Sequence, residues 1–338
     1  MGAQSRINAN TIFLTAGLLL LGYLLGDVLL LVFAGVLLAV VLDGMASAAS
    51  GRLSVSRGWM LAGFTIGLVS LLIATFSLSA TRLIEQFQAL IDTMIDFVEK
   101  LHTQLSDLGV LDFLGVMDGE GEGFAGAAGD LAGQAMNWGM TVVGAITSLG
   151  IIVVLTLFLA ARPKLYRQGA VRLVPPDHRE MVDETLSGIA HALRWWFFGQ
   201  LVSMGFLGIT VGLGFLFLGV DLWLGLAVLT ALLSAVPFIG PLIATVPIVA
   251  VGFSEGMQTG LIVLGGYLVI QGVESNLLMP IIQQKAVNLA PALLIAVQVL
   301  LGVVFGVMGL ILAAPLTIVA MVAVQKLWVE HILGEKVA

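Results

Sequence analysis

The chain has 338 residues, of which 59% are apolar and only 10% charged, and its mean hydropathy is +1.09. One soluble core cannot bury that much apolar surface, so the composition indicates a protein whose partner is the lipid bilayer. The net charge of −7 argues against a nucleic-acid partner, and the absence of Cys excludes disulfides and thiolate chemistry.

Apolar runs along the chain predict an all-α polytopic membrane protein with about eight transmembrane helices, since about 20 apolar residues cross the bilayer as a helix. Three of these helices fall in residues 1–79, and Asp27 marks a tight turn between the first two. The first run is expected to be a span and not a removable signal peptide. The apolar runs are Thr11–Leu25, Val28–Leu42, Trp59–Ser79, Trp138–Ala161, Trp195–Gly219, Leu222–Phe253, Leu261–Val273 and Ala286–Gln325.

Residues 80–137 form an acidic excursion on the extracytoplasmic side, with ten acidic residues and two basic ones. Apolar residues at helical spacing predict an amphipathic helix on the outer face. They are Leu83, Phe87, Leu90, Met94, Val98, Leu101 and Leu105. The Gly-rich tract from Asp118 to Gly133 then reads as a mobile loop. The excursion is either an acidic vestibule or partner surface, or a solvated spacer between two spans.

The fourth span, residues 138–161, leads into a basic cytoplasmic segment, residues 162–194. Asp177 and Glu180 follow Pro176 at the spacing of a capping box, which predicts that a helix starts there. Its apolar stripe favours a helix on the bilayer surface that runs into the span at Trp195. The stripe consists of Met181, Leu186, Ile189 and Leu193.

The distribution of Lys and Arg predicts a cytoplasmic N-terminus and a cytoplasmic tail at residues 326–338. This orientation places eleven of the 14 basic side chains inside and three outside, as the positive-inside rule favours. The three outside are Arg82, Lys100 and Lys285.

Residues 195–325 are expected to form the transport core. Leu222–Phe253 would be roughly 48 Å long as one helix, more than one crossing needs. Pro237, Gly240 and Pro241 near its middle predict a break. A break frees backbone carbonyls at membrane depth, where they are tolerated only if protein or water satisfies them.

Ala286–Gln325 also exceeds one crossing, and a re-entrant piece followed by a crossing fits its length. Proline and glycine residues in it can act as hinges or as a small face for helix packing. They are Pro291, Gly302, Gly306, Gly309 and Pro315. Paired interrupted segments of this kind are typical of discontinuous transporter helices.

Between the two broken segments lies a polar cluster of Gln271, Glu274 and Asn276, followed by Pro280. An ionised carboxylate inside a membrane is costly, so Glu274 should be neutral, paired or in contact with water. Glu274 is the best candidate for proton or cation coupling, and the alternative is an interfacial residue that caps a helix junction. Lys285 is its nearest basic residue in sequence. Gln200 and Gln298 are more typical of interhelical hydrogen bonds than of ligands.

No motif for catalysis, metal or cofactor binding is found. A phosphate-binding loop and a nucleophile elbow are absent, and the four His residues form no His-Glu-x-x-His pair. We therefore expect no enzyme activity, no catalytic residue, no metal and no cofactor.

At these motifs the chain resembles the autoinducer-2 exporter family, also called PerM-like permeases, over nearly its whole length. The residues that carry the resemblance are Val236–Pro241, Gln271–Glu274, Asn276–Pro280, Gly302–Gly309 and Ala314–Pro315. The resemblance implies a multi-pass inner-membrane protein that exports small molecules, and a homo-oligomer. Some members resemble cation/proton antiporters.

The leading hypothesis is a secondary transporter of a small molecule or ion. Its path runs between the Pro237–Pro241 break, Glu274 with Asn276, and the Gly302–Gly309 face. The alternative is a membrane scaffold that recruits partners and has no transport of its own.

Overall fold

The computed structural model describes residues 22, 24–53, 55–107, 138–280 and 290–334. Within these ranges every regular element is a helix, which confirms the all-α prediction. The expected first span, the Asp118–Gly133 tract and Lys285 lie essentially outside the described residues.

Four helices in the described ranges are long and apolar enough to cross a membrane. They lie within Gly26–Gly51, Pro176–Phe217, Met257–Leu278 and Pro291–Glu330. A fifth candidate is a bent pair, in which α6 (Trp138–Ala161) meets α7 (Pro163–Arg172) at 83°. Four or five candidate spans make a multi-pass membrane protein, and the larger count of about eight stays a prediction.

The third predicted span and the amphipathic helix that follows it form one element, α3 (Arg57–Asp107), beside the preceding helix α2 (Gly26–Leu53). Leu90 of α3 is only 2% exposed and packs in a cluster with Phe215 and Leu226. The expected outer-face helix is therefore docked on the helical body.

A side chain of α3 also fixes the turn before α9 (Trp223–Leu233). Gln86 Nε2 donates to the Asp221 carbonyl at 3.0 Å, and Gln86 Oε1 accepts from the Gly225 amide at 2.6 Å. The same amide side chain thus satisfies two backbone groups at the start of a helix, where such groups lack helical partners.

After the short η1 (Pro176–His178), α8 (Arg179–Phe217) continues without interruption into the predicted span at Trp195. The stripe expected on the bilayer surface faces protein instead, because Leu193 is 2% exposed and Ile189 packs in the same cluster as Leu312 and Ile318. An apolar stripe alone does not distinguish lipid from a neighbouring helix.

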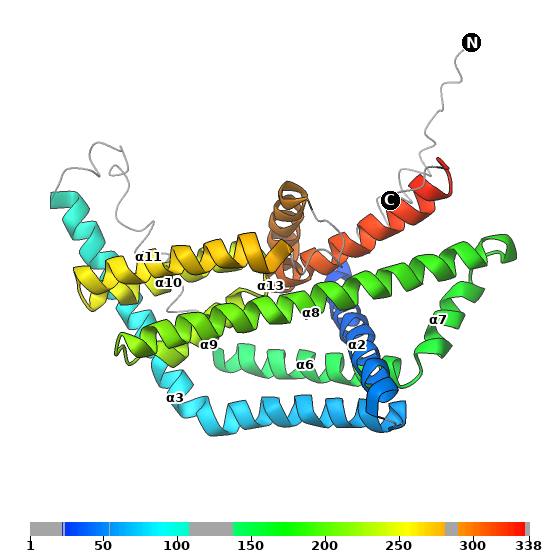
Figure 1. Ribbon diagram of the computed structural model, residues 1–338, viewed down its shortest axis with the longest axis horizontal. Helices are drawn as coiled ribbons and strands as arrows, with labels where there is room; N and C mark the ends of the chain where they lie inside the picture. Colours follow the sequence, from blue (N-terminus) through cyan, green and yellow to red (C-terminus); the bar gives the residue numbers. More distant parts are fainter. Residues whose placement is uncertain (1–21, 23, 54, 108–137, 281–289, 335–338) are drawn as a thin grey trace, which may run out of the picture.

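The C-terminal core consists of broken helices. Leu222–Phe253 divides into α9 and α10 (Ile239–Ser254), as predicted from its prolines. Then follow α11 (Met257–Val273), the π-helical η2 (Glu274–Leu278), α13 (Pro291–Ala323) and the π-helical η3 (Val324–Glu330). Figure 1 shows α8 running through the molecule, with α9, α10 and α11 along one end and α7 at the other.

The helix α13 folds back at Gly306, whose φ of +62° and ψ of −147° are not helical. A Cβ on Gly302 would contact Leu310 at 3.3 Å, and one on Gly309 would collide with the Leu301 carbonyl. Residues eight apart would be about 12 Å apart in a straight helix, so two limbs pack against each other here. The Gly306 hinge agrees with the predicted interruption, while a re-entrant position in the membrane stays a prediction.

A charge cluster centred on Asp43 joins four helices. Arg57 at the start of α3 lies 2.5 Å from one carboxylate oxygen of Asp43, and its guanidinium also donates to the Ala160 carbonyl of α6 at 2.7 Å. Arg194 of α8 lies 3.3 Å from the other carboxylate oxygen and donates to the Val40 carbonyl of α2 at 3.0 Å. Asp43 is thus the anion shared by two arginines.

The Asp43→Asn variant is expected to lower the free energy of unfolding by about 1–3 kcal/mol, because both Arg57 and Arg194 lose their counterion. Asp43 is 16% exposed, whereas the Arg167–Asp183 pair is 44% and 47% exposed. The matched Asp183→Asn variant should therefore cost under about 1 kcal/mol. Unfolding in detergent measures the free energy of unfolding of both variants. Equal losses would contradict the claim that Asp43 stabilises the fold more than an exposed ion pair does.

Candidate functional site

The break between α9 and α10 is a tight backbone turn at Phe238. Its φ of +64° and ψ of −56°, with the Ile239 amide donating to the Pro237 carbonyl at 2.8 Å, describe a γ-turn with positive φ. Such a turn is strained for a residue with a side chain and persists only where the surroundings enforce it.

Two carbonyls of the break have no helical donor, one because of Pro241 and the other because the chain leaves the helix at Phe238. Pro241 has no N–H to donate to Pro237, four residues earlier, so the Pro237 carbonyl accepts from Gln298 Nε2 at 3.0 Å. The Ser234 carbonyl accepts from Gln200 Nε2. The break is therefore held from two sides, by α8 and by α13, and both glutamines act as interhelical hydrogen-bonding residues.

Two further contacts set the position of α10. Gly240 is buried, and a Cβ there would lie closer than 3.0 Å to the Leu233 carbonyl, so only glycine allows this approach. The Tyr267 hydroxyl of α11 donates to the Pro241 carbonyl at 2.8 Å. Pro237, Gly240 and Pro241 thus form a compact, buried turn.

Glu274 is buried at the junction of α11 and η2, with 6% of its surface exposed. Ser203 Oγ of α8 donates to Glu274 Oε1 at 2.6 Å. Among the described residues no Lys, Arg or His forms an ion pair with this carboxyl group. A π-helical turn often marks a functional site.

Helix α8 brings the break and Glu274 together. Gln200 and Ser203 are three residues apart, so their side chains lie on the same face of α8, about 5–6 Å apart at Cβ. One binds the break and the other binds Glu274. Two neighbouring side chains of α8 therefore join Glu274 to the Ser234 carbonyl just before the break, while a substrate or ion path at this place stays a prediction.

Oxygen acceptors lie on the helix that leads to Glu274 and, separately, at the break, where Gln298 contacts Pro237. Tyr267, Gln271 and Glu274 follow one another at helical spacing on α11 and η2. Gln271 Oε1 and Gln298 Oε1 are both buried without a hydrogen-bond partner in the described part of the chain. Unpaired buried acceptors favour a ligand that offers protons, hydroxyl groups or positive charge. No group of three or more His, Cys, Asp or Glu suited to a metal occurs among the described residues.

Other predicted residues lie apart from this cluster. Asn276 is exposed, and its side-chain amide donates to the Gly272 carbonyl at 2.9 Å, while Pro280 is also exposed. Pro291 is the first residue of α13, and Pro315 is buried within it. Gly302, Gly306 and Gly309 form the fold-back of α13 described above.

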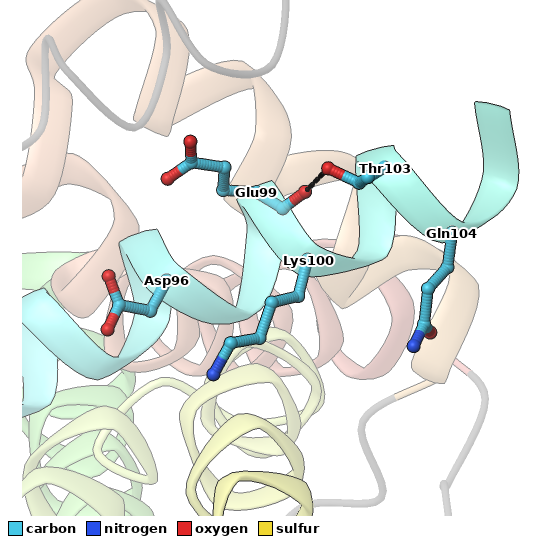
Figure 2. Close-up of a pocket in the computed structure, with 5 residues that line it drawn as sticks. All are labelled: Asp96, Glu99, Lys100, Thr103 and Gln104. Carbon is cyan, nitrogen blue, oxygen red and sulfur yellow. Dashed lines mark hydrogen bonds between the residues drawn. The ribbon is translucent and has the colours of Figure 1, made fainter. Parts of the chain in front are cut away.

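A surface pocket of about 520 Å³, which Glu274 does not line, lies near the end of α3. Figure 2 shows that its five lining side chains come from this one helix, and that Thr103 donates to the Glu99 carbonyl. The lining residues are Asp96, Glu99, Lys100, Thr103 and Gln104. Since these side chains project from one exposed helix, the pocket is a less suitable binding site than the buried cluster.

Ser203, Ser234 and Tyr267 belong to the site but were not predicted from the sequence. The usable signal for Ser203 was its spacing of three residues from Gln200, which places both polar groups on one face of an apolar helix. Tyr267 lies seven residues before Glu274, two turns along the same face.

The fold and the site together define a multi-pass helical membrane protein with discontinuous helices, an arrangement typical of secondary transporters. The chain belongs to the AI-2E family of transporters, because residues 11–328 match the family model described as AI-2E family transporter. This confirms the resemblance found in the sequence motifs. It is a family of transporters and permeases and not of enzymes.

Three relatives illustrate the match. YueF of Bacillus subtilis, named for an inferred transport role, is 25% identical over 178 residues, 52% of this chain and 48% of YueF. PerM of Escherichia coli, named for an inferred permease role, is 29% identical over 168 residues, which are 49% of this chain and 48% of PerM. The AI-2 transport protein TqsA of E. coli is 33% identical over 95 residues, 28% of each chain. The chain spans about half the length of YueF and PerM.

Proposed function

We propose that the protein is a secondary transporter of the inner membrane that exports a small signal molecule resembling autoinducer-2 or exchanges cations for protons. The observation that carries the proposal is Glu274, a carboxyl group that is 6% exposed, hydrogen-bonded by Ser203 and placed beside a broken helix. An ionisable group within a membrane protein is by default a candidate for substrate or ion coupling.

In this proposal, binding of a proton or cation at Glu274 neutralises the buried charge and changes the relative stability of two access states. A ligand shifts such an equilibrium only by its difference in affinity between the states. The α9–α10 break is suited to respond, because Ser203 and Gln200 of α8 join Glu274 to the Ser234 carbonyl. Discontinuous helices of this kind supply polar backbone groups at the sites of many transporters.

The amide oxygens of Gln271 and Gln298 have no hydrogen-bond partner among the described residues. Each fits a solute whose hydroxyl group donates a hydrogen bond, or a cation that an oxygen can coordinate. A cytoplasmic N-terminus and a homo-oligomeric assembly are part of the same proposal, from the charge distribution and the family resemblance respectively.

The test is flux in vesicles reconstituted with the full-length protein. Vesicles that contain a pH-sensitive dye are exposed in turn to Na⁺, K⁺ and Li⁺, and vesicles loaded with autoinducer-2 are assayed for efflux at several pH values. We expect a cation-dependent pH change, or efflux faster than from protein-free vesicles.

The alternative is a membrane scaffold, for which the exposed charged side chains Asp96, Glu99 and Lys100 on α3 provide a surface. A folded, monodisperse protein that shows no flux with any of these solutes, and that purifies with one constant partner, would favour the scaffold.

A further inference from the structure

The short helix α7 lies across the end of a span. It meets α6 at 83°, begins with Pro163 and has no buried residue. Figure 1 shows it bridging the end of α6 and the start of α8. If α6 crosses the bilayer, a helix nearly perpendicular to it lies along the membrane surface.

The charge on and around α7 has one sign. Residues 162–176 contain four basic side chains and no Asp or Glu. Arg167 pairs with Asp183 of α8 at 2.6 Å and donates to Ser187 Oγ at 2.5 Å. Arg162, Lys164 and Arg172 form no ion pair with any described residue. Within the described part of the chain, these three positive charges therefore have no counterion.

The same segment exposes large apolar side chains on one side. Leu165, Tyr166 and Leu173 are 58%, 45% and 89% exposed. At about 100° per residue, these three positions fall within about 100° of one another around the helix. Arg167 lies outside this sector, so its pairing with Asp183 turns the apolar side away from α8.

An exposed tryptophan lies at the same end of the molecule. Arg57 donates to the Ala160 carbonyl at the end of α6, and Trp59, two residues later, is 76% exposed. Trp is enriched where the bilayer meets water. This places the start of α7 near the level of the lipid headgroups.

We propose that α7 binds anionic phospholipid headgroups, with Leu165, Tyr166 and Leu173 inserted at the boundary between headgroups and acyl chains. Arg162, Lys164 and Arg172 pair with the lipid phosphates. A basic helix with an apolar side is the type of element that binds anionic membrane surfaces. The occupant is a lipid because the charge is complementary and the helix axis runs along the surface. The proposal does not depend on transport.

The sequence contains no Cys, so a single introduced Cys can be labelled specifically. Leu173→Cys and the matched control Gln168→Cys, about 140° away around the helix, are spin-labelled in the full-length protein. Each is reconstituted in phosphatidylcholine vesicles with or without phosphatidylglycerol. We expect the label at 173 to be more accessible to oxygen than to an aqueous nickel complex, and the label at 168 to show the reverse.

Replacing Arg162, Lys164 and Arg172 together by Gln should move the 173 label toward water in phosphatidylglycerol vesicles and leave it unchanged in phosphatidylcholine alone. A 173 label as accessible to nickel as the 168 label would overturn the proposal. Equal burial of the 173 label in both lipid mixtures would overturn the role of anionic headgroups. Circular dichroism of each variant checks that it is folded.

Discussion

The Glu274→Gln variant is expected to transport more slowly than the unmodified protein and with no dependence on pH. Gln has nearly the same shape and can still accept the hydrogen bond from Ser203, but it cannot bind a proton or balance a cation. Flux in reconstituted vesicles, measured at several pH values, gives both quantities. The size of the effect follows from the burial of Glu274 and the lack of an ion-pair partner in the described structure.

Two variants make this result specific. Glu255→Gln changes an exposed carboxyl group at the end of α10 and should leave flux and its pH profile as in the unmodified protein. Ser203→Ala removes only the hydrogen bond to Glu274, so its effect should be smaller and the pH dependence should remain. Unchanged flux and pH dependence in Glu274→Gln would remove Glu274 from the mechanism.

The Gly240→Ala variant is expected to lower the free energy of unfolding by at least about 1–3 kcal/mol, the usual cost of overpacking. The added Cβ meets the Leu233 carbonyl, a backbone atom that cannot rotate away. Relief requires α9 and α10 to separate, which disturbs the bond from Gln200 to the Ser234 carbonyl. The apparent unfolding temperature in detergent and the flux in vesicles should therefore both fall.

Gly265→Ala is the matched control, since it makes the same chemical change in the middle of α11. No atom lies within 4 Å of a Cβ at that position. Alanine there should stabilise the helix by up to about 1 kcal/mol through its better helix propensity. If both variants unfold at the same temperature, the close approach at Gly240 is not what holds the break.

The break could be predicted from the sequence because its cause is local. Pro237 and Pro241 remove backbone donors wherever they occur in a helix. The turn itself lies at Phe238, and Gly240 allows α10 to approach the Leu233 carbonyl. The groups that satisfy the freed carbonyls could not be assigned in the same way. Gln200 and Gln298 lie 34 and 61 residues from their acceptors, so only the tertiary packing decides this pairing.

The helix boundaries show a different limit. The predicted change at residue 80 is a change of environment, from apolar to acidic, and no proline interrupts residues 57–107, so α3 simply continues. The stripe that includes Ile189 and Leu193 was correctly read as apolar, but it packs on protein. Glu274 is 6% exposed, and its role in coupling stays a prediction. Ser203 gave one weak signal, its spacing from Gln200, because a lone serine is common in apolar helices.

The cluster around Asp43 also sets an order of assembly during synthesis. Arg57 follows Asp43 by 14 residues, whereas Arg194 follows it by 151. At roughly 5–20 residues per second, the ribosome delivers Arg194 about 8–30 s after Asp43. The α2–α3 corner can therefore form first as a local hairpin. The Asp43 carboxylate then pairs only with Arg57 until α8 has been synthesised and brings Arg194. Asp43 of α2 thus keeps one carboxylate oxygen available for α8, which is synthesised later.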